Sequence, residues 1–378
     1  MLTEQAALLS LLETLSGEER IAVDTEFHRE RTYYPKAALI QIAWPGGLVL
    51  LDPLELDLAP LAALMESDAL WVMHAAGQDI EVFQRVCGTA PRHLFDTQLA
   101  AGFKGMSSPS LSALHQHELG FKLSKGDRLT DWLARPLTES QMEYAASDVA
   151  HLLEIHDRLT TELDERGRLA WAVAECEELL ARETTRRIPE DAWRRIKEAR
   201  SLSGKALLMV RSVAAWREHR AAEMDIPVRH VLPDLAVVAI AQKAPATREA
   251  LKKIRGVDGR HLKGETAEGI LKAVATAADL PPLESGDYRK QGRQRDLRAA
   301  VTLVSAWVAQ LARDLEMDPA LVGTRSDIEA LVGNDKGSRM AHGWRHELVG
   351  EPVEELLSGR TALAFDGEGE LVLVPHNG

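Results

Sequence analysis

The first 165 residues alternate short apolar runs with helical periodicity, whereas the rest of the chain is helical in pattern almost throughout. Short apolar runs bounded by polar residues predict buried strands. Such runs lie at 20–26, 37–44, 47–51 and 69–74. Strands mixed with helices predict an α/β sheet covered on both faces. The helical patterns that can cover the sheet lie at 3–14, 58–66, 77–87, 96–103, 110–117 and 138–164.

The strand predicted at 20–26 ends in two acids, Asp24 and Glu26. Side chains two residues apart on a strand point to the same face, so both carboxylates project together. Two bare carboxylates about 5 Å apart repel by roughly 3 kcal/mol at an effective dielectric constant near 20. A proton, a basic partner or a cation between them removes this cost, and all-oxygen ligands favour Mg²⁺ or Mn²⁺. Two solvated acids at a strand end are the alternative.

Two further acids lie where they can join this pair. Asp79 is in the first turn of the helix predicted at 77–87. Open sheets place ligand groups at such strand-to-helix junctions, although an acid there also interacts favourably with the helix dipole. Tyr144 and Asp148 are four residues apart in the helix predicted at 138–164, so they share one face. An acid on a face that packs on the sheet needs a partner, unless it lies at the rim of the core.

Three other residues near these acids are interpreted structurally. Asp96 is predicted to be the N-cap of the helix that follows it. Trp132 is predicted to lie in the core, and His74 to be a hydrogen-bonded structural histidine. The basic residues at 186–200 are predicted to form a solvated helix face.

The strand-free half of the chain divides into two helical units of similar size. Helices predicted at 205–223, 232–243, 247–253 and 266–277 form the first unit. A segment rich in proline, glycine and serine follows and indicates a linker. The second unit covers about 290–358, and the tail after it predicts a small hairpin around Gly367-Glu368-Gly369.

The net charge of −13 is unevenly distributed. Residues 1–180 carry 14 Lys and Arg against 29 Asp and Glu, whereas 205–276 carry 13 against 8. An acidic domain joined to a basic module fits metal-dependent catalysis followed by nucleic-acid binding, and it also fits ordinary solvated helices.

Composition excludes several classes of protein. No apolar stretch approaches the length of a membrane span, and the N-terminus lacks the basic and small-residue features of a signal peptide. Cys87 and Cys176 fit neither a metal spacing nor a disulfide framework. We therefore expect a reduced, cytoplasmic setting, and nothing indicates an obligate protein partner or oligomer, so we expect a monomer.

The acids belong to an ordered set of motifs that resembles the ribonuclease D family, the D-E-D-D exonucleases with a tyrosine in the third motif. The set is DTEFHRERTYYPKAALIQIA, HAAGQDIEVFQR, FDTQLAA and SKGDRLTDWLARPLTESQMEYAASDV. The resemblance covers essentially the whole chain. It implies a ribonuclease H-like exonuclease domain and a metal-dependent 3′→5′ exoribonuclease that trims RNA 3′ ends, most typically those of tRNA precursors.

The resemblance also implies roles for single residues. The catalytic set is Asp24, Glu26, Asp79, Tyr144 and Asp148, and the four acids among them hold two divalent cations, Mg²⁺ or Mn²⁺. The products are nucleoside 5′-monophosphates. A 3′→5′ DNA exonuclease uses the same metal chemistry, and a catalytically silent RNA-binding scaffold is the alternative outside the enzymes.

The helical units resemble the helicase-and-ribonuclease-D C-terminal (HRDC) domain. The implied organisation is an exonuclease domain at 1–168, a helical linker at 169–204, a first HRDC domain at 205–280, a second, degenerate copy at 288–360 with GWRHELVG at 343–350, and a tail at 361–378. For contacts to RNA we expect Phe27, which can stack on a base or pack, and Lys125, which follows Ser124 where relatives often carry an aspartate. The expected phosphate contacts in the first unit are Lys205, Arg211, Lys252, Lys253, Arg255, Arg260 and Lys263.

Overall fold

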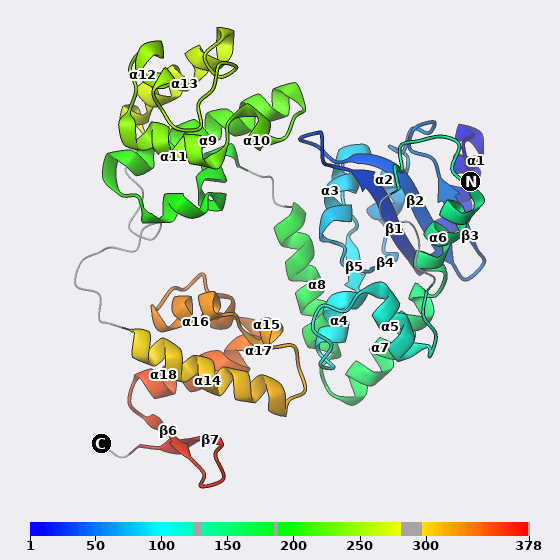
Figure 1. Ribbon diagram of the computed structural model, residues 1–378. Coiled ribbons are helices and arrows are strands. Elements are labelled where there is room, and N and C mark those ends of the chain that lie inside the picture. The colour runs from blue at the N-terminus through cyan, green and yellow to red at the C-terminus, as the bar shows by residue number, and fades with distance from the viewer. Residues whose placement is uncertain (124–129, 185–187, 281–296, 377–378) are drawn as a thin grey trace.

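The computed structural model describes residues 1–376 apart from 124–129, 185–187 and 281–296 (Figure 1). Its N-terminal part contains a five-stranded mixed sheet with the strand order β3-β2-β1-β4-β5. Strand β1 pairs antiparallel with β2 and parallel with β4, so it lies at the centre. The strands are β1 (Arg20–His28), β2 (Lys36–Trp44), β3 (Gly47–Leu51), β4 (Leu70–Met73) and β5 (His93–Asp96).

Helices cover both faces of this sheet, as the alternating pattern predicts. Ile21 and Val23 of β1 face a core shared with α1, α2 and α3. Ala22 faces the other way, against Val149 and Leu152. The helices of this part are α1 (Gln5–Leu15), α2 (Leu61–Met65), α3 (Gly77–Val86), α4 (Thr97–Gly102), α5 (Leu111–Glu118), α6 (Glu139–Ala150), α7 (Leu152–Glu165) and α8 (Leu169–Thr184).

The four predicted strands are confirmed, and two other features were not predicted. Strand β5 has only two apolar residues, Leu94 and Phe95, and its pairing with β4 rather than local periodicity makes it a strand. The single helix predicted at 138–164 is wrong, because His151 has φ −118° and ψ 5° and separates α6 from α7. Neither proline nor glycine marks that break in the sequence.

The first helical unit has its own core. Its helices are α9 (Gly204–Met224), α10 (Val228–Val231), α11 (Asp234–Lys243), α12 (Arg248–Lys252), α13 (Gly264–Thr276) and η3 (Ala277–Asp279), which confirms the helices predicted here. Two 3₁₀ helices, η1 (Pro189–Arg195) and η2 (Lys197–Ser201), precede it. Trp193 and Ile196 of this segment are buried in the same core. The described basic residues of this segment, Arg194, Arg195 and Lys197, are exposed, as predicted, although they lie on 3₁₀ helices in a segment that also buries Trp193 and Ile196.

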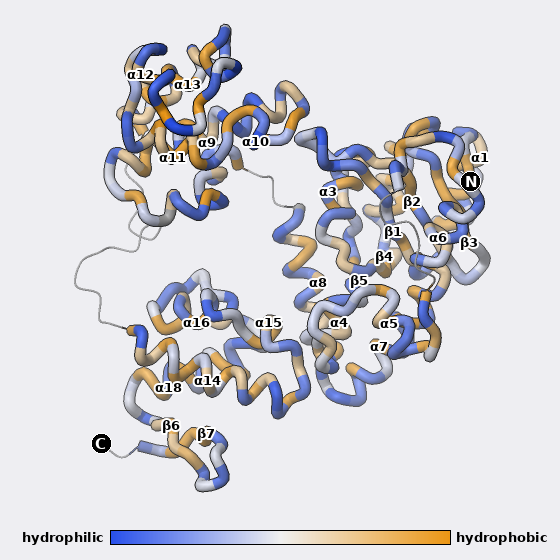
Figure 2. Tube along the Cα trace, viewed as in Figure 1, coloured by the Kyte–Doolittle hydropathy of each residue, from blue (hydrophilic) through white to orange (hydrophobic). Residues whose placement is uncertain are grey.

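The second helical unit ends in the predicted hairpin. Its helices are α14 (Arg298–Asp314), α15 (Pro319–Val322), α16 (Arg325–Val332), η4 (Arg339–Ala341), α17 (Gly343–Arg345), the π-helix η5 (His346–Gly350) and α18 (Glu351–Leu357). Hydrophobic and hydrophilic residues alternate along these helices, as expected for amphipathic packing (Figure 2). Strands β6 (Thr361–Phe365) and β7 (Leu371–Pro375) pair antiparallel. The degenerate relation of this unit to the first and the limits of the five predicted segments stay predictions.

Both helical units contact the sheet-containing part. Trp344 of the second unit stacks on Trp171 of α8, with ring centroids 5.1 Å apart and an interplanar angle of 14°. Arg345 forms an ion pair with Glu175 of α8, and both side chains are buried. The cores of the two parts are continuous there.

The first helical unit is held by the connection between β1 and β2. The Tyr33 hydroxyl donates a hydrogen bond to Glu218 of α9 at 2.8 Å. The Asp225 carboxylate accepts from the backbone N–H groups of Tyr33 and Tyr34, each at 3.1 Å. None of the described helices combines the length and the apolar character that crossing a membrane requires.

Candidate active site

Strand β1 carries Asp24 and Glu26 on the face of the sheet that α6 covers. Alternate residues face opposite sides of a strand. Val23 therefore packs into the core beneath α3, and Ala22 faces α6. The pairing of β1 with β2 shifts register between Glu26 and Phe27, which marks a bulge near the end of β1.

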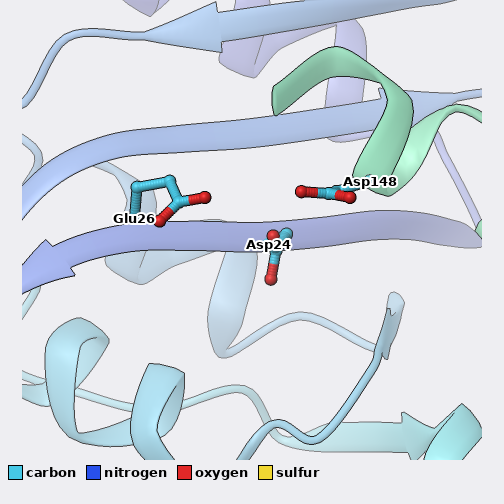
Figure 3. Close-up of side chains that lie close together, drawn as sticks. All are labelled: Asp24, Glu26 and Asp148. Carbon is cyan, nitrogen blue, oxygen red and sulfur yellow. The ribbon is translucent and has the colours of Figure 1, made fainter. Parts of the chain in front are cut away.

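Helix α6 brings Asp148 to the same place. A capping box between Thr138 and Gln141 fixes the start of this helix. Ala145 and Val149 are fully buried against the sheet, which turns the neighbouring Asp148 inward. One ligand oxygen from each of Asp24, Glu26 and Asp148 can be chosen so that all three lie within 4.8 Å of one another. Figure 3 shows the two β1 acids and the α6 acid gathered around one space.

The three acids line one cavity of about 360 Å³. The cavity is also lined by His74, Leu111, Trp132, Tyr144 and Leu152. Tyr144 stacks beside Trp132, with ring centroids 6.2 Å apart and an interplanar angle of 28°. Trp132 is buried, as predicted, and it fixes the tyrosine ring next to the carboxylates. The structure thus brings the predicted Tyr144 to the predicted acids.

Asp79 lies beside this group rather than within it. It is buried in the first turn of α3, where its carboxylate accepts a hydrogen bond from the Thr25 hydroxyl. Thr25 lies between Asp24 and Glu26 but faces the opposite side of β1. Of the four acids expected to converge, Asp24, Glu26 and Asp148 form one group. The fourth, Asp79, is hydrogen-bonded to Thr25, the residue between the two β1 acids.

Asp96 positions the segment that leads into α3. Its carboxylate accepts from the backbone N–H groups of Gln98 and Leu99, which confirms the predicted N-cap. It also accepts from the N–H groups of Ala75 and Ala76, at 3.1 and 2.8 Å. These bonds fix the turn between β4 and α3, so they also fix the position of Asp79 at the start of α3.

Burial and mutual repulsion disfavour the ionised carboxylates. Burial raises the pKa of Asp24 to about 6. Burial, together with the negative charges of Asp24, Asp148 and Asp79, raises the pKa of Glu26 to about 8. Burial and the charge of Asp24 raise the pKa of Asp79 well above its usual range. Either protons or a cation must compensate this cluster.

The remaining predicted residues have mixed outcomes. Phe27 is half-buried, which leaves its stacking role a prediction. Lys125 lies outside the described residues. The side chains of the first helical unit that were expected to contact phosphate are exposed except Arg211, which is half-buried. The exposed ones are Lys205, Lys252, Lys253, Arg255, Arg260 and Lys263.

Two residues near the site were not predicted to be there. His74 has hydrogen-bond partners on both ring nitrogens, Thr97 at 2.9 Å and the Pro109 carbonyl at 3.1 Å, as expected for a structural histidine. Its ring nevertheless lines the cavity of the acids. Thr25 holds Asp79. The sequence did contain a sign of this role. Thr25 lies between the two β1 acids, so the alternation of side chains along a strand places it on the side of the sheet that α3 covers.

The residues present fit divalent cations. The donor set is made only of carboxylate oxygens, which suits hard cations such as Mg²⁺ and Mn²⁺ and excludes the mixed nitrogen and sulfur ligation typical of zinc. Burial raises the carboxyl pKa values of Asp24, Glu26 and Asp79, and neighbouring negative charge raises those of Glu26 and Asp79 further. The buried amide of Gln41, on the strand paired with β1, has no hydrogen-bond partner among the described residues. The site therefore has the oxygen ligands that a divalent cation needs, and its buried carboxylates would be stabilised by the positive charge of such a cation.

The fold and the carboxylate site define the class of this protein, that of the 3′-5′ exonucleases. Residues 1–164 match the 3′-5′ exonuclease family model, and residues 207–274 match the HRDC domain model. This exonuclease fold implies the use of divalent metal ions.

The relatives identify the family within that class. The chain is 36% identical over 382 residues to ribonuclease D of Nitrobacter hamburgensis, covering all of both chains. It is 35% identical over 374 residues to ribonuclease D of Gluconacetobacter diazotrophicus, covering 97% of this chain and 95% of that one. The crystal structure of Escherichia coli RNase D, described as an exoribonuclease involved in structured RNA processing, superposes with a TM-score of 0.84 at 33% identity, covering 95% of this chain and 98% of that one. The chain belongs to the ribonuclease D family, and it is a 3′→5′ exoribonuclease.

The raised pKa of Glu26 predicts how stability depends on pH when EDTA removes divalent cations. Between the ordinary value of 4.5 and the folded value of about 8, the folded chain holds a proton on Glu26 that the unfolded chain has lost. The free energy of unfolding therefore decreases as pH rises through this range. Glu26→Gln removes this titration, so its melting temperature should decrease less between pH 5 and pH 8. Thermal melts of both proteins in EDTA measure this, and equal slopes would contradict the account of the site.

Proposed function

We propose that this protein shortens structured RNA from the 3′ end, with tRNA precursors as its substrates, by hydrolysis that uses two Mg²⁺ or Mn²⁺ ions. The observation that carries the proposal is the gathering of Asp24, Glu26 and Asp148 around one cavity beside Tyr144. The crystal structure of the E. coli relative supports the choice of structured RNA, because that protein is described as acting in structured RNA processing.

The proposed ligand roles follow from position. Asp24 lies close to both Glu26 and Asp148 and would contact both cations, whereas Glu26 and Asp148 would complete the first site. Asp79 lies beside the group and would reach the second cation through water, because Mg²⁺ keeps several waters of hydration. When bound, two divalent ions supply an activated water and neutralise charge on the scissile phosphate.

The other cavity residues orient and shield the reaction. A tyrosine hydroxyl is a poor base at neutral pH, so Tyr144 would orient the attacking water by hydrogen bonding. Trp132 stacks on Tyr144 and limits its movement. Leu111 and Leu152 line the cavity with apolar surface, which reduces competing water around the phosphate. The released products would be nucleoside 5′-monophosphates.

RNA would be held by two kinds of contact. Phe27 follows the catalytic acids at the bulge of β1, where its ring could stack on the terminal base. Lys252, Lys253 and Arg255 are exposed at the end of α12 and would contact phosphates. Lys205, Arg211, Arg260 and Lys263 of the same unit, with Lys125 of the exonuclease part, complete the proposed set.

We also propose the domain limits given by the sequence, a monomeric enzyme and a cytoplasmic location. Both cysteines, Cys87 and Cys176, are free and buried, which suits a reducing compartment.

A time course with end-labelled RNA tests the proposed function. A stem-loop RNA with an unpaired 3′ tail, labelled at its 5′ end, is incubated with Mg²⁺, Mn²⁺ or EDTA and resolved on a gel. We expect stepwise shortening from the 3′ end with either cation and no shortening in EDTA. A DNA strand of the same sequence is the comparison, and faster shortening of DNA would indicate a DNA exonuclease. Internal cuts, or cleavage in EDTA, would contradict the proposed function.

The basic residues of α12 and its end predict a salt dependence of RNA binding. Phosphate contacts release counterions, at about 0.7 per contact for single strands. Replacing Lys252, Lys253 and Arg255 together with alanine should therefore weaken binding and flatten the slope of log Kobs against log salt by about 2. The matched control replaces three exposed arginines of the second unit, which changes the net charge equally: Arg313, Arg325 and Arg360.

The measurement is fluorescence anisotropy with a labelled RNA in EDTA, between about 50 and 200 mM salt. The control triple variant should keep the wild-type slope. An unchanged slope in the α12 variant, or equal slopes in both variants, would contradict phosphate binding by this segment.

A further inference from the structure

A glutamine side chain is buried beside the carboxylates without a hydrogen bond. Gln41 of β2 is 0% exposed, and neither its Oε1 nor its Nε2 has a partner among the described residues. A glutamine amide offers two donor hydrogens and an acceptor oxygen. Leaving both ends unpaired in the protein interior is unfavourable, and such groups are rare in folded proteins.

The register of the sheet places this amide next to the active-site acids. Gln41 is the direct partner of Asp24 in the antiparallel pairing of β2 with β1. Side chains of direct partners lie on the same face, with Cβ atoms about 4.5–5.5 Å apart. The partners Ala22 and Ala43, one step along the same face, pack against Val149 of α6. Gln41 therefore lies beneath the helix that supplies Asp148, with Asp24 at its side.

No packing argument accounts for a polar residue at this position. Every other residue of β2 from Ala37 to Ala43 is apolar and buried. An apolar side chain of the same length would fill the space without unsatisfied atoms. The unpaired amide therefore lowers the stability of the protein when no cation is bound. The carboxylate of the paired Asp24 and water that accompanies a cation are two groups that could satisfy it.

We propose that Gln41 is a positioning residue of the metal site, with Nε2 donating to the Asp24 carboxylate and Oε1 accepting from water held beside the cations. This inference rests on the proposed two-cation site. A neutral donor can hold a carboxylate ligand in one orientation without competing for the cation. Partners of this kind typically contribute 10-fold to 100-fold to metal affinity.

The test compares Gln41→Met with Ile42→Met in the full chain. Methionine matches glutamine in length and lack of branching but carries no amide. Ile42 is the adjacent residue of β2, and its side chain lies on the opposite face in the core beneath α3. Two quantities are measured for each variant and the wild type: the melting temperature in EDTA, and the dissociation constant for Mn²⁺ without RNA, by isothermal titration calorimetry.

We expect the two substitutions to differ in both readouts. Gln41→Met should melt at or above the wild-type temperature in EDTA, because it removes unsatisfied buried atoms, and should bind Mn²⁺ at least about 10-fold more weakly. Ile42→Met should keep the wild-type affinity for Mn²⁺. A residue with a purely structural role would show the reverse pattern, a lower melting temperature and an unchanged affinity.

The outcomes separate this inference from the proposed function. If the wild type binds no Mn²⁺, the proposed cation site itself fails. If the wild type binds Mn²⁺ and Gln41→Met binds it equally well, the role of Gln41 is overturned. A melting temperature well below that of the wild type also overturns it. Gln41→Leu is the second variant, and failure of both variants to fold would show that the amide is needed for the fold rather than for the metal.

Discussion

Asp24→Asn is expected to lower the turnover of RNA by at least about 10³-fold, which corresponds to about 4 kcal/mol of transition-state stabilisation. Asparagine keeps the shape of the side chain but removes the charge that faces Glu26 and Asp148. Because Asp24 is the ligand proposed to contact both cations, its loss should weaken both sites at once. Asp148→Asn should give a comparable loss, since Asp148 belongs to the same group of carboxylates.

The fold of the Asp24→Asn variant should remain intact. Burial raises the pKa of Asp24 to about 6, so the charged form is disfavoured in the folded protein. Removing the charge should leave the melting temperature in EDTA equal to or above that of the wild type at pH 8. Asp68→Asn is the matched control, because its side chain is 89% exposed and pairs with the surface residues Arg92 and His93. Turnover within 10-fold of the wild type in pure Asp24→Asn protein would refute the assignment of Asp24.

The second large effect concerns the attachment of the second helical unit. Glu175 of α8 accepts hydrogen bonds from Arg345, from Arg339 at 3.0 Å and from Trp344 Nε1 at 3.2 Å. Glu175 and Arg345 are 4% and 3% exposed. Glu175→Leu leaves the buried Arg345 charge with a hydrogen bond to the Leu321 carbonyl at 2.7 Å and a longer 3.5 Å ion pair with Glu178. Removal of one partner from a buried ion pair typically costs about 3–5 kcal/mol, and we expect a loss of this size.

Two further variants make the prediction specific. Glu177→Leu makes the same substitution two residues along α8, where the side chain is exposed, and should change the free energy of unfolding by less than about 0.5 kcal/mol. The double variant Glu175→Leu with Arg345→Met should recover most of the lost stability, because it removes the uncompensated charge. Urea unfolding of the full chain measures all three. A loss below about 1 kcal/mol for Glu175→Leu would show that this ion pair does not hold the unit in place.

The local sequence predicts the active-site strand and its acids well. Alternation along β1 determines that Asp24 and Glu26 share a face, and the capping and apolar residues of α6 determine that Asp148 turns inward. Both features depend on the side-chain periods of a strand, two residues, and of a helix, 3.6 residues, and these periods can be read from a single sequence. The family resemblance predicted the same residues and the two types of domain. The relatives confirm the family and the fold.

Features that depend on contacts between distant segments were not predictable in this way. Strand β5 is a strand because it pairs with β4, and the break at His151 has no local marker. The GWRHELVG segment resembles a degenerate motif in sequence, yet its Trp344 and Arg345 lie against α8, about 170 residues away. The unsatisfied amide of Gln41 became visible only when the packing around β2 was known. Tertiary contacts of this kind leave no periodicity in the chain.

The central claim is that carboxylates from β1 and α6 hold two divalent cations in one cavity. Anomalous diffraction from crystals of this protein soaked in Mn²⁺ measures this directly. The account predicts two Mn²⁺ peaks in the cavity lined by Asp24, Glu26 and Asp148, with Asp24 in contact with both. Ordered Mn²⁺ bound elsewhere on the protein, with none among these three carboxylates, would contradict it.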